Sequence, residues 1–133
     1  MILIFCLVFR DIHHPGLCAV VSGSFIPTFM CIIYDGPLAN TLDVFIHDSD
    51  YTELDFKSKV KVAIDLLKAL DFLHERGMYH MNFKSNNIVI GDPLKIQLYD
   101  YGLYATVLAD VMPDALTVFE PLWIAPESLL RFP

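Results

Sequence analysis

Residues 56–75 carry the clearest periodic pattern in the chain. Apolar side chains recur there every three or four positions, at Phe56, Val60, Ala63, Leu67 and Leu70. This spacing places them on one face of a helix, and such a stripe is core in most proteins. Asp55, just before the stripe, suits an N-cap, and Gly77 suits the end of a helix. The pattern predicts a helix over residues 56–75.

Two apolar runs in the first third of the chain are typical of strands. Residues 17–26 and 28–35 are rich in β-branched and aromatic side chains and are separated by a proline, which predicts an antiparallel pair. Residues 36–41 contain glycine, proline and asparagine and are predicted to be a loop. A short helical turn is expected within residues 42–50.

A second pair of β-like runs, residues 86–90 and 95–100, flanks the sequence Gly91-Asp92-Pro93. Glycine, aspartate and proline suit a tight turn, so these runs predict a hairpin. Its outer ends carry Asn87 and Asp100. Magnesium is typically held by one or two protein oxygens together with nucleotide phosphates. This pair could supply such oxygens, although one asparagine and one aspartate alone are not specific to a metal site.

Composition adds a constraint on size and class. The chain has 133 residues, enough for one domain, and 55% of them are hydrophobic, with a mean hydropathy of +0.49. The longest apolar run, residues 1–9, is about half the ~20 residues that a membrane-spanning helix needs. It also lacks the basic start and the cleavage site of a signal peptide. We therefore expect a structural role for this run and no membrane span, and we interpret the apolar excess as a sign of a larger fold.

Charge and cysteine usage exclude further classes. The net charge is −7 and the basic residues are scattered, so nucleic acid is not an expected partner. Cys6, Cys18 and Cys31 are odd in number and widely spaced, unlike a disulfide framework or a zinc site. They indicate buried thiols in a reducing compartment. We expect a cytoplasmic protein, or the cytoplasmic part of a membrane receptor.

Several short motifs surround the hairpin in a fixed order. They are the run from His80 to Asn87, the run Asp-Tyr-Gly-Leu that begins at Asp100, and Ala125-Pro126-Glu127 shortly after Trp123. The order is that of the protein-kinase signature set. The chain thus resembles the eukaryotic protein kinase family over essentially its whole length. A tryptophan two residues before Ala-Pro-Glu is typical of the tyrosine-kinase and tyrosine-kinase-like branches.

The resemblance assigns roles within the catalytic loop. His80 falls on the loop histidine, which largely holds the loop by a hydrogen bond, and Lys84 falls on the lysine that faces phosphate. Asn82 occupies the catalytic-base position, where the family has aspartate. Met81 occupies the position of the arginine that pairs with a phosphorylated activation segment.

The resemblance also implies a nucleotide site. Asn87 falls on the metal-binding asparagine, and Asp100 falls on the metal-binding aspartate of Asp-Phe-Gly. Gly102 completes that motif and is expected to border the cofactor, while Tyr101 replaces its phenylalanine and is expected to be a packed aromatic. Ala125-Pro126-Glu127 is expected to be structural. The implied cofactors are ATP and Mg²⁺.

The implied fold is α+β and protein-kinase-like, but partial. Residues 1–46 would form the end of the small lobe and the hinge. Residues 47–133 would form the first part of the helical large lobe, with its catalytic loop and activation segment. The glycine-rich loop and the lysine-bearing strand of a kinase would precede Met1, and the rest of the large lobe would follow Pro133.

Besides Tyr101, three residues depart from the family pattern. Asn82 has nearly the shape of aspartate but lacks a basic oxygen at neutral pH, so phosphoryl transfer should be weak. Met81 cannot pair with a phosphate, so phosphorylation of the activation segment could not switch the domain through this position. Phe5 falls where the small-lobe glutamate should pair with the catalytic lysine.

Four functions remain after this comparison. We expect a catalytically impaired pseudokinase that keeps a Mg²⁺–ATP site and acts in signalling by binding a protein partner or regulating a linked domain. One alternative is an active protein kinase with another proton acceptor. A second is the kinase-homology domain of a receptor guanylyl cyclase, which the loop sequence, Asp-Tyr-Gly-Leu and Leu-Trp-x-Ala-Pro-Glu also resemble. A third is an unrelated α/β binding domain.

Overall fold

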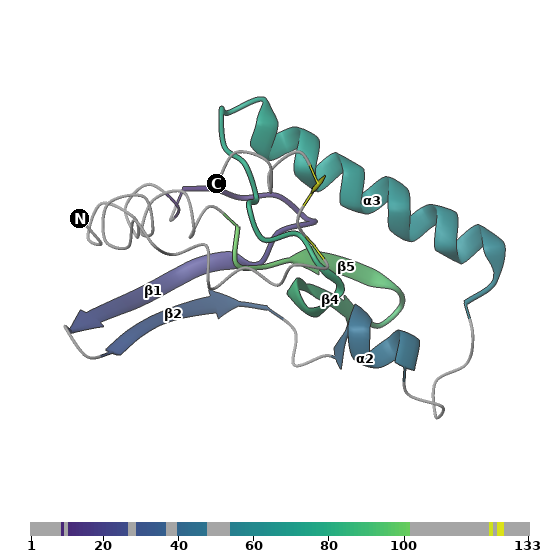
Figure 1. The fold of residues 1–133 in the computed structure, drawn as a ribbon, viewed down its shortest axis with the longest axis horizontal. Helices are drawn as coiled ribbons and strands as arrows, with labels where there is room; N and C mark the ends of the chain where they lie inside the picture. Colours follow the sequence, from purple (N-terminus) through teal and green to yellow (C-terminus); the bar gives the residue numbers. More distant parts are fainter. Residues whose placement is uncertain are drawn as a thin grey trace.

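A computed structural model of the chain describes most of its first 101 residues. The described residues are 9, 11–26, 29–36, 40–47, 54–101, 123, 125 and 126. Phe5, Gly102 and Glu127, to which the sequence assigned roles, lie outside the described residues. So does most of the predicted activation segment. This part of the chain contains a long helix, a short helix and two small sheets, and Figure 1 shows how they are arranged.

The two apolar runs near the start of the chain form the predicted antiparallel pair. β1 (Ala19–Ile26) and β2 (Phe29–Asp35) make a two-stranded ribbon (Figure 1). The register pairs Val20 with Tyr34 and shifts before Ser22, as in a β-bulge. Val20 is buried and Tyr34 packs against the core, so this end of the ribbon is attached to the rest of the fold.

The second sheet contains the predicted hairpin and one additional short strand. Its order is β3 (Asn40–Thr41), β4 (Ile88–Gly91) and β5 (Lys95–Leu98), and all neighbours are antiparallel. Asn40 and Thr41 lie in a segment that the sequence predicted to be a loop. Two residues are too few to show an alternating pattern, so only their pairing with β4 defines them as a strand.

Backbone hydrogen bonds attach the segment before β1 to β5. Cys18 N donates to Leu98 O at 2.8 Å, and Leu98 N donates to Gly16 O at 2.8 Å. The same segment lies directly against a helix, because a Cβ on Gly16 would come within 2.9 Å of the Ala69 Cβ. Real Cβ atoms do not approach so closely, so a residue without a side chain is required at this contact.

Both predicted helices are present. α2 (Leu42–His47) is short, and α3 (Phe56–His74) ends one residue before the predicted boundary. Asp55 caps α3 as expected, since its Oδ1 accepts a hydrogen bond from Ser58 N at 2.8 Å. Gly77 has φ +68° just after the helix, a conformation that suits glycine. α3 packs along β5 (Figure 1).

The predicted core stripe of α3 was wrong. Phe56 is 82% exposed and Leu67 is 64% exposed, while Val60 and Ala63 are also exposed and only Leu70 packs against the core. The buried residues of α3 are instead Val62, Ala69 and Leu73. This helix carries apolar residues on two faces, and periodicity alone cannot tell which face meets the sheet.

A single cluster of buried residues joins α3, both sheets and the segment before β1. Its members are Phe9, Leu17, Val20, Val62, Ala69, Leu73, Ile88, Ile90, Ile96, Leu98 and Tyr101. Among the described residues, no helix is both long and apolar enough to cross a membrane.

Two leucines on α3 provide a test of which face is core. Leu73→Ala, at a fully buried position, should lower the free energy of unfolding by about 2–5 kcal/mol, because it removes core contacts and leaves a cavity. Leu67→Ala makes the same chemical change at an exposed position and should change it by about 0.5 kcal/mol or less. Urea denaturation measures both. Equal losses would show that the exposed face is also packed.

Candidate functional site

The β4–β5 hairpin places two predicted site residues at its open end. Ile88 pairs with Leu98, and just beyond this pair Tyr99 N donates to Asn87 O at 3.2 Å. Asn87, which is 5% exposed, is the last residue of a short 3₁₀ helix, η1 (Ser85–Asn87). The hairpin therefore brings Asn87 next to the segment that carries Asp100, as the sequence predicted.

Asn82 connects the two residues. Its side-chain amide Nδ2 donates to Asp100 Oδ2 at 2.7 Å, and its backbone carbonyl accepts a hydrogen bond from Asn87 Nδ2 at 2.7 Å. Because a carbonyl and a carboxylate can only accept, both amide groups must present their NH₂ to these partners. Asn82, Asn87 and Asp100 thus form one hydrogen-bonded cluster, which we call the site cluster.

Two non-glycine residues in this region have left-handed backbone conformations. Met81 and Asp100 both have φ 64°. This region costs an L-residue roughly 1–2 kcal/mol, so the surrounding contacts must compensate. Around Met81 the side chains alternate: His80 is 3% exposed, whereas Tyr79, Met81 and Phe83 are all exposed. His80 and Asn82 consequently face the interior of the site.

His80 is held as a neutral, buried ring. Its Nδ1 accepts a hydrogen bond from Asn82 N at 3.3 Å, so the neutral ring carries its proton on Nε2. Burial lowers the pKa of His80 from 6.5 to about 4, and hydrogen bonds with the backbone of His80 and Tyr99 offset only part of that change. His80 thus contacts the loop through Nδ1, while its buried Nε2 has no hydrogen-bond partner among the described residues.

Asp100 is an anionic group in a partly desolvated position. Burial raises the pKa of its carboxyl above the usual value, and the Asn82 hydrogen bond and the positive charge of Lys84 oppose that change. A carboxylate in this position gains from a nearby cation. Asp100 and Asn87 are also the oxygen-bearing residue types that Mg²⁺ accepts, so the residues present fit that ion.

Hydrogen bonds made by residues beside the site cluster hold this arrangement. Ser85 Oγ donates to Asp43 Oδ1 at 2.9 Å, which attaches η1 to α2. Tyr99 Oη donates to Asn86 O at 2.6 Å, and Tyr101 Oη donates to Cys18 O at 2.8 Å. The expectation of a packed Tyr101 is confirmed, since it is 1% exposed. Ser85 and Tyr99 were missed, although both adjoin predicted site residues.

The remaining predicted site residues lie in the last part of the chain. Ala125 and Pro126 are exposed, and Trp123 is 50% exposed. Gly102 and Glu127 are outside the described residues. The predicted structural role of Ala125-Pro126-Glu127 and the cofactor role of Gly102 stay predictions.

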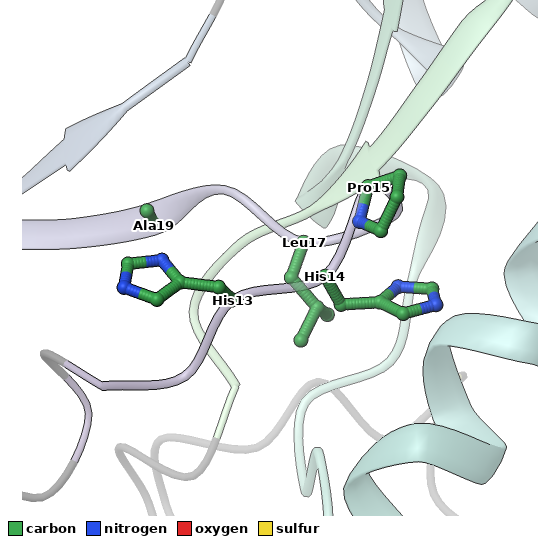
Figure 2. Close-up of a pocket in the computed structure, with 5 residues that line it drawn as sticks. All are labelled: His13, His14, Pro15, Leu17 and Ala19. Carbon is green, nitrogen blue, oxygen red and sulfur yellow. The ribbon is translucent and has the colours of Figure 1, made fainter.

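A shallow hollow of about 300 Å³ lies in a different part of the molecule, lined by His13, His14, Pro15, Leu17 and Ala19 (Figure 2). Figure 2 shows the two imidazole rings extending in different directions from the backbone. His14 Nδ1 accepts a hydrogen bond from Gly16 N at 3.0 Å, and its ring stacks on Phe72. The hydrogen bond from Gly16 N thus holds His14 in the turn that leads to Gly16.

The sequence matches a known family over nearly all of its length. Residues 6–132 match the family described as "Protein tyrosine and serine/threonine kinase". The chain belongs to this protein kinase family. Its predicted α+β, protein-kinase-like fold is thereby confirmed, and the match includes the segments that form the site cluster.

Individual relatives agree with this assignment. The chain is 27% identical to the serine/threonine-protein kinase PAK 5 of Rattus norvegicus and 25% identical to PAK 4 of Homo sapiens, each over 96% of this kinase-family chain. It is 32% identical, over 69% of its length, to the putative proline-rich receptor-like protein kinase PERK11 of Arabidopsis thaliana. The chain spans only 17%, 21% and 13%, respectively, of these relatives.

The buried state of His80 predicts a pH dependence of stability. Between pH 6.5 and about 4 the unfolded chain binds a proton at this residue and the folded chain does not. The free energy of unfolding should therefore decrease by on the order of 3 kcal/mol as the pH falls through this window. Chemical denaturation across pH measures it.

One variant isolates the contribution of this residue. His80→Gln should flatten the pH dependence between pH 6.5 and 4 by one proton relative to the wild type. An identical slope in the wild type and in His80→Gln would show that His80 is protonated in the folded protein.

Proposed function

We propose that this member of the kinase family is a catalytically impaired pseudokinase, which keeps a Mg²⁺–ATP site and acts in signalling through a protein partner or a linked domain. The observation that carries this proposal is the state of Asn82. At the catalytic-base position its side chain donates a hydrogen bond to Asp100 at 2.7 Å, where an acid would instead accept a proton from the substrate.

Asn82 cannot replace the missing acid. An amide oxygen does not take up a proton near neutral pH, and its NH₂ group is already committed to Asp100. Help from a general base contributes about 10²–10⁴ in rate. Hydrogen bonds hold the loop while its proton acceptor is absent, which supports weak or absent phosphoryl transfer rather than a disordered site.

The nucleotide site is supported by the other members of the cluster. Asp100 and Asn87 would hold the metal ion, and Mg²⁺ would supply charge neutralisation for the phosphates. Asn82 orients both residues through its two hydrogen bonds. Lys84, whose charge acts on Asp100, would face the phosphates.

Met81 supports a binding role rather than a switched enzyme. It occupies the position of the family's phosphate-pairing arginine and is 52% exposed. A thioether carries no charge, so a phosphorylated activation segment would gain no ion pair there. We propose regulation through contacts with another protein or a linked domain in place of that switch.

An active kinase is the main alternative. His80, Lys84, Asn87 and Asp100 all match the family pattern, and the relatives named above are kinases. In that case the substrate hydroxyl would lose its proton without help from Asn82. A role as the kinase-homology domain of a receptor guanylyl cyclase, and membership of the tyrosine-kinase-like branch, rest on sequence resemblance alone.

Phosphoryl transfer from Mg²⁺–ATP to a peptide substrate tests the proposal in the full-length gene product. Wild-type protein should transfer phosphate at or near background. Asn82→Asp restores a proton acceptor and should raise the rate by about 10²-fold or more. Asn40→Asp, the same change at an exposed asparagine of β3, is the matched control and should have no effect.

Nucleotide binding is measured on the same proteins. Asp100→Ala should abolish Mg²⁺-dependent ATP binding, since it removes the carboxylate of the site. Robust phosphate transfer by the wild type that disappears in Asp100→Ala would establish an active kinase and contradict the pseudokinase hypothesis. Wild-type protein that binds no Mg²⁺–ATP would defeat the nucleotide site.

A further inference from the structure

Asp100 lies between two tyrosines whose hydroxyl groups are both hydrogen bonded to the main chain. Tyr99 Oη donates to Asn86 O at 2.6 Å, and Tyr101 Oη donates to Cys18 O at 2.8 Å. The bonds are short, and each joins the residue beside Asp100 to a distant segment. We call Tyr99 and Tyr101 the tyrosine clamp.

The two acceptors belong to separate parts of the fold. Asn86 lies in η1, next to Asn87, so the Tyr99 bond links the Asp100 segment to the other expected metal ligand. Cys18 lies just before β1, where its backbone N is bonded to Leu98 O. The clamp therefore attaches one flank of Asp100 to the catalytic loop and the other to the strand segment beside β5.

Ring packing places these hydroxyls. The Tyr101 ring is buried and lies 5.7 Å from the Phe9 ring, centroid to centroid. Tyr34, on β2, lies 6.0 Å from the Tyr99 ring and 6.4 Å from the Tyr101 ring. These are ordinary aromatic contact distances. Because packing holds the rings without the hydroxyls, the hydroxyl bonds can be removed separately by phenylalanine.

Asp100 needs such support because of its backbone. With φ 64° it occupies the left-handed region, which an L-residue keeps only when surrounding contacts impose it. In this conformation its Oδ2 accepts the 2.7 Å hydrogen bond from Asn82 Nδ2. An extended backbone at Asp100 would point its side chain elsewhere. The residues on either side of Asp100 therefore affect whether its carboxylate reaches the site cluster.

We propose that the hydroxyl groups of Tyr99 and Tyr101 are positioning groups that hold Asp100 in its left-handed conformation and thereby keep its carboxylate aligned with Asn82 and Asn87 for a divalent cation. The part that concerns the cation rests on the proposed function. The part that concerns the Asp100–Asn82 hydrogen bond does not.

The first test measures Mn²⁺ binding to the full-length protein by electron paramagnetic resonance. Tyr99→Phe and Tyr101→Phe each remove one hydroxyl and keep the ring. Each should weaken Mn²⁺ binding by about two- to tenfold, the value of one ordinary hydrogen bond, and the double variant should weaken it further. Tyr79→Phe, at an exposed tyrosine outside the clamp, is the matched control and should bind as the wild type does.

A second readout needs no cation. The Asn82 side-chain NH₂ resonances report its hydrogen bond with Asp100 in the NMR spectrum of the metal-free protein. In Tyr101→Phe and Tyr99→Phe these resonances should move toward those of a solvated amide and exchange faster with solvent. A purely structural role for the hydroxyls would lower the unfolding midpoint and leave the Asn82 resonances of the folded protein in place.

The outcomes separate the two proposals. Unchanged Mn²⁺ affinity together with unchanged Asn82 resonances in both single variants would overturn the clamp. If the wild type binds no Mn²⁺, the proposed cation site fails, and the NMR comparison alone decides whether the clamp positions Asp100.

Discussion

The backbone pairing of Leu98 is the constraint on which the other elements depend. This residue is fully buried, is paired with Ile88 of β4 on one side, and exchanges hydrogen bonds with Gly16 and Cys18 on the other. The segment before β1, the β4–β5 hairpin and the buried face of α3 all meet at it. Asp100 follows only two residues later, so the buried end of β5 fixes where Asp100 lies.

The elements with strong local signals were predictable from sequence. The cap at Asp55, the hairpin turn that follows Gly91 and the antiparallel pairing of β1 with β2 each reflect interactions between residues close in the chain. The buried face of α3 was not predictable, because its choice depends on what α3 meets in three dimensions. The pairing of β3 escaped detection for the same reason, since only its partner β4 makes it a strand.

The site shows the same division between local and long-range information. A fixed spacing of motifs identified His80, Asn82, Asn87 and Asp100, and the hairpin brings the last two to one end. The sequence could not show that Asn82 uses its NH₂ on Asp100 and its carbonyl on Asn87. It also gave no sign of the hydroxyl bonds of the clamp, because their acceptors are backbone carbonyls, which every residue possesses.

The contact between Gly16 and Ala69 has an evolutionary consequence. Their backbones approach so closely that a Cβ on Gly16 would be 2.9 Å from that of Ala69. Enlarging either residue alone would push α3 away from the strand segment that holds β5. A larger residue at one position should therefore be tolerated only in a lineage in which the other position has already changed. These two small residues should vary together, although 53 positions separate them in the chain.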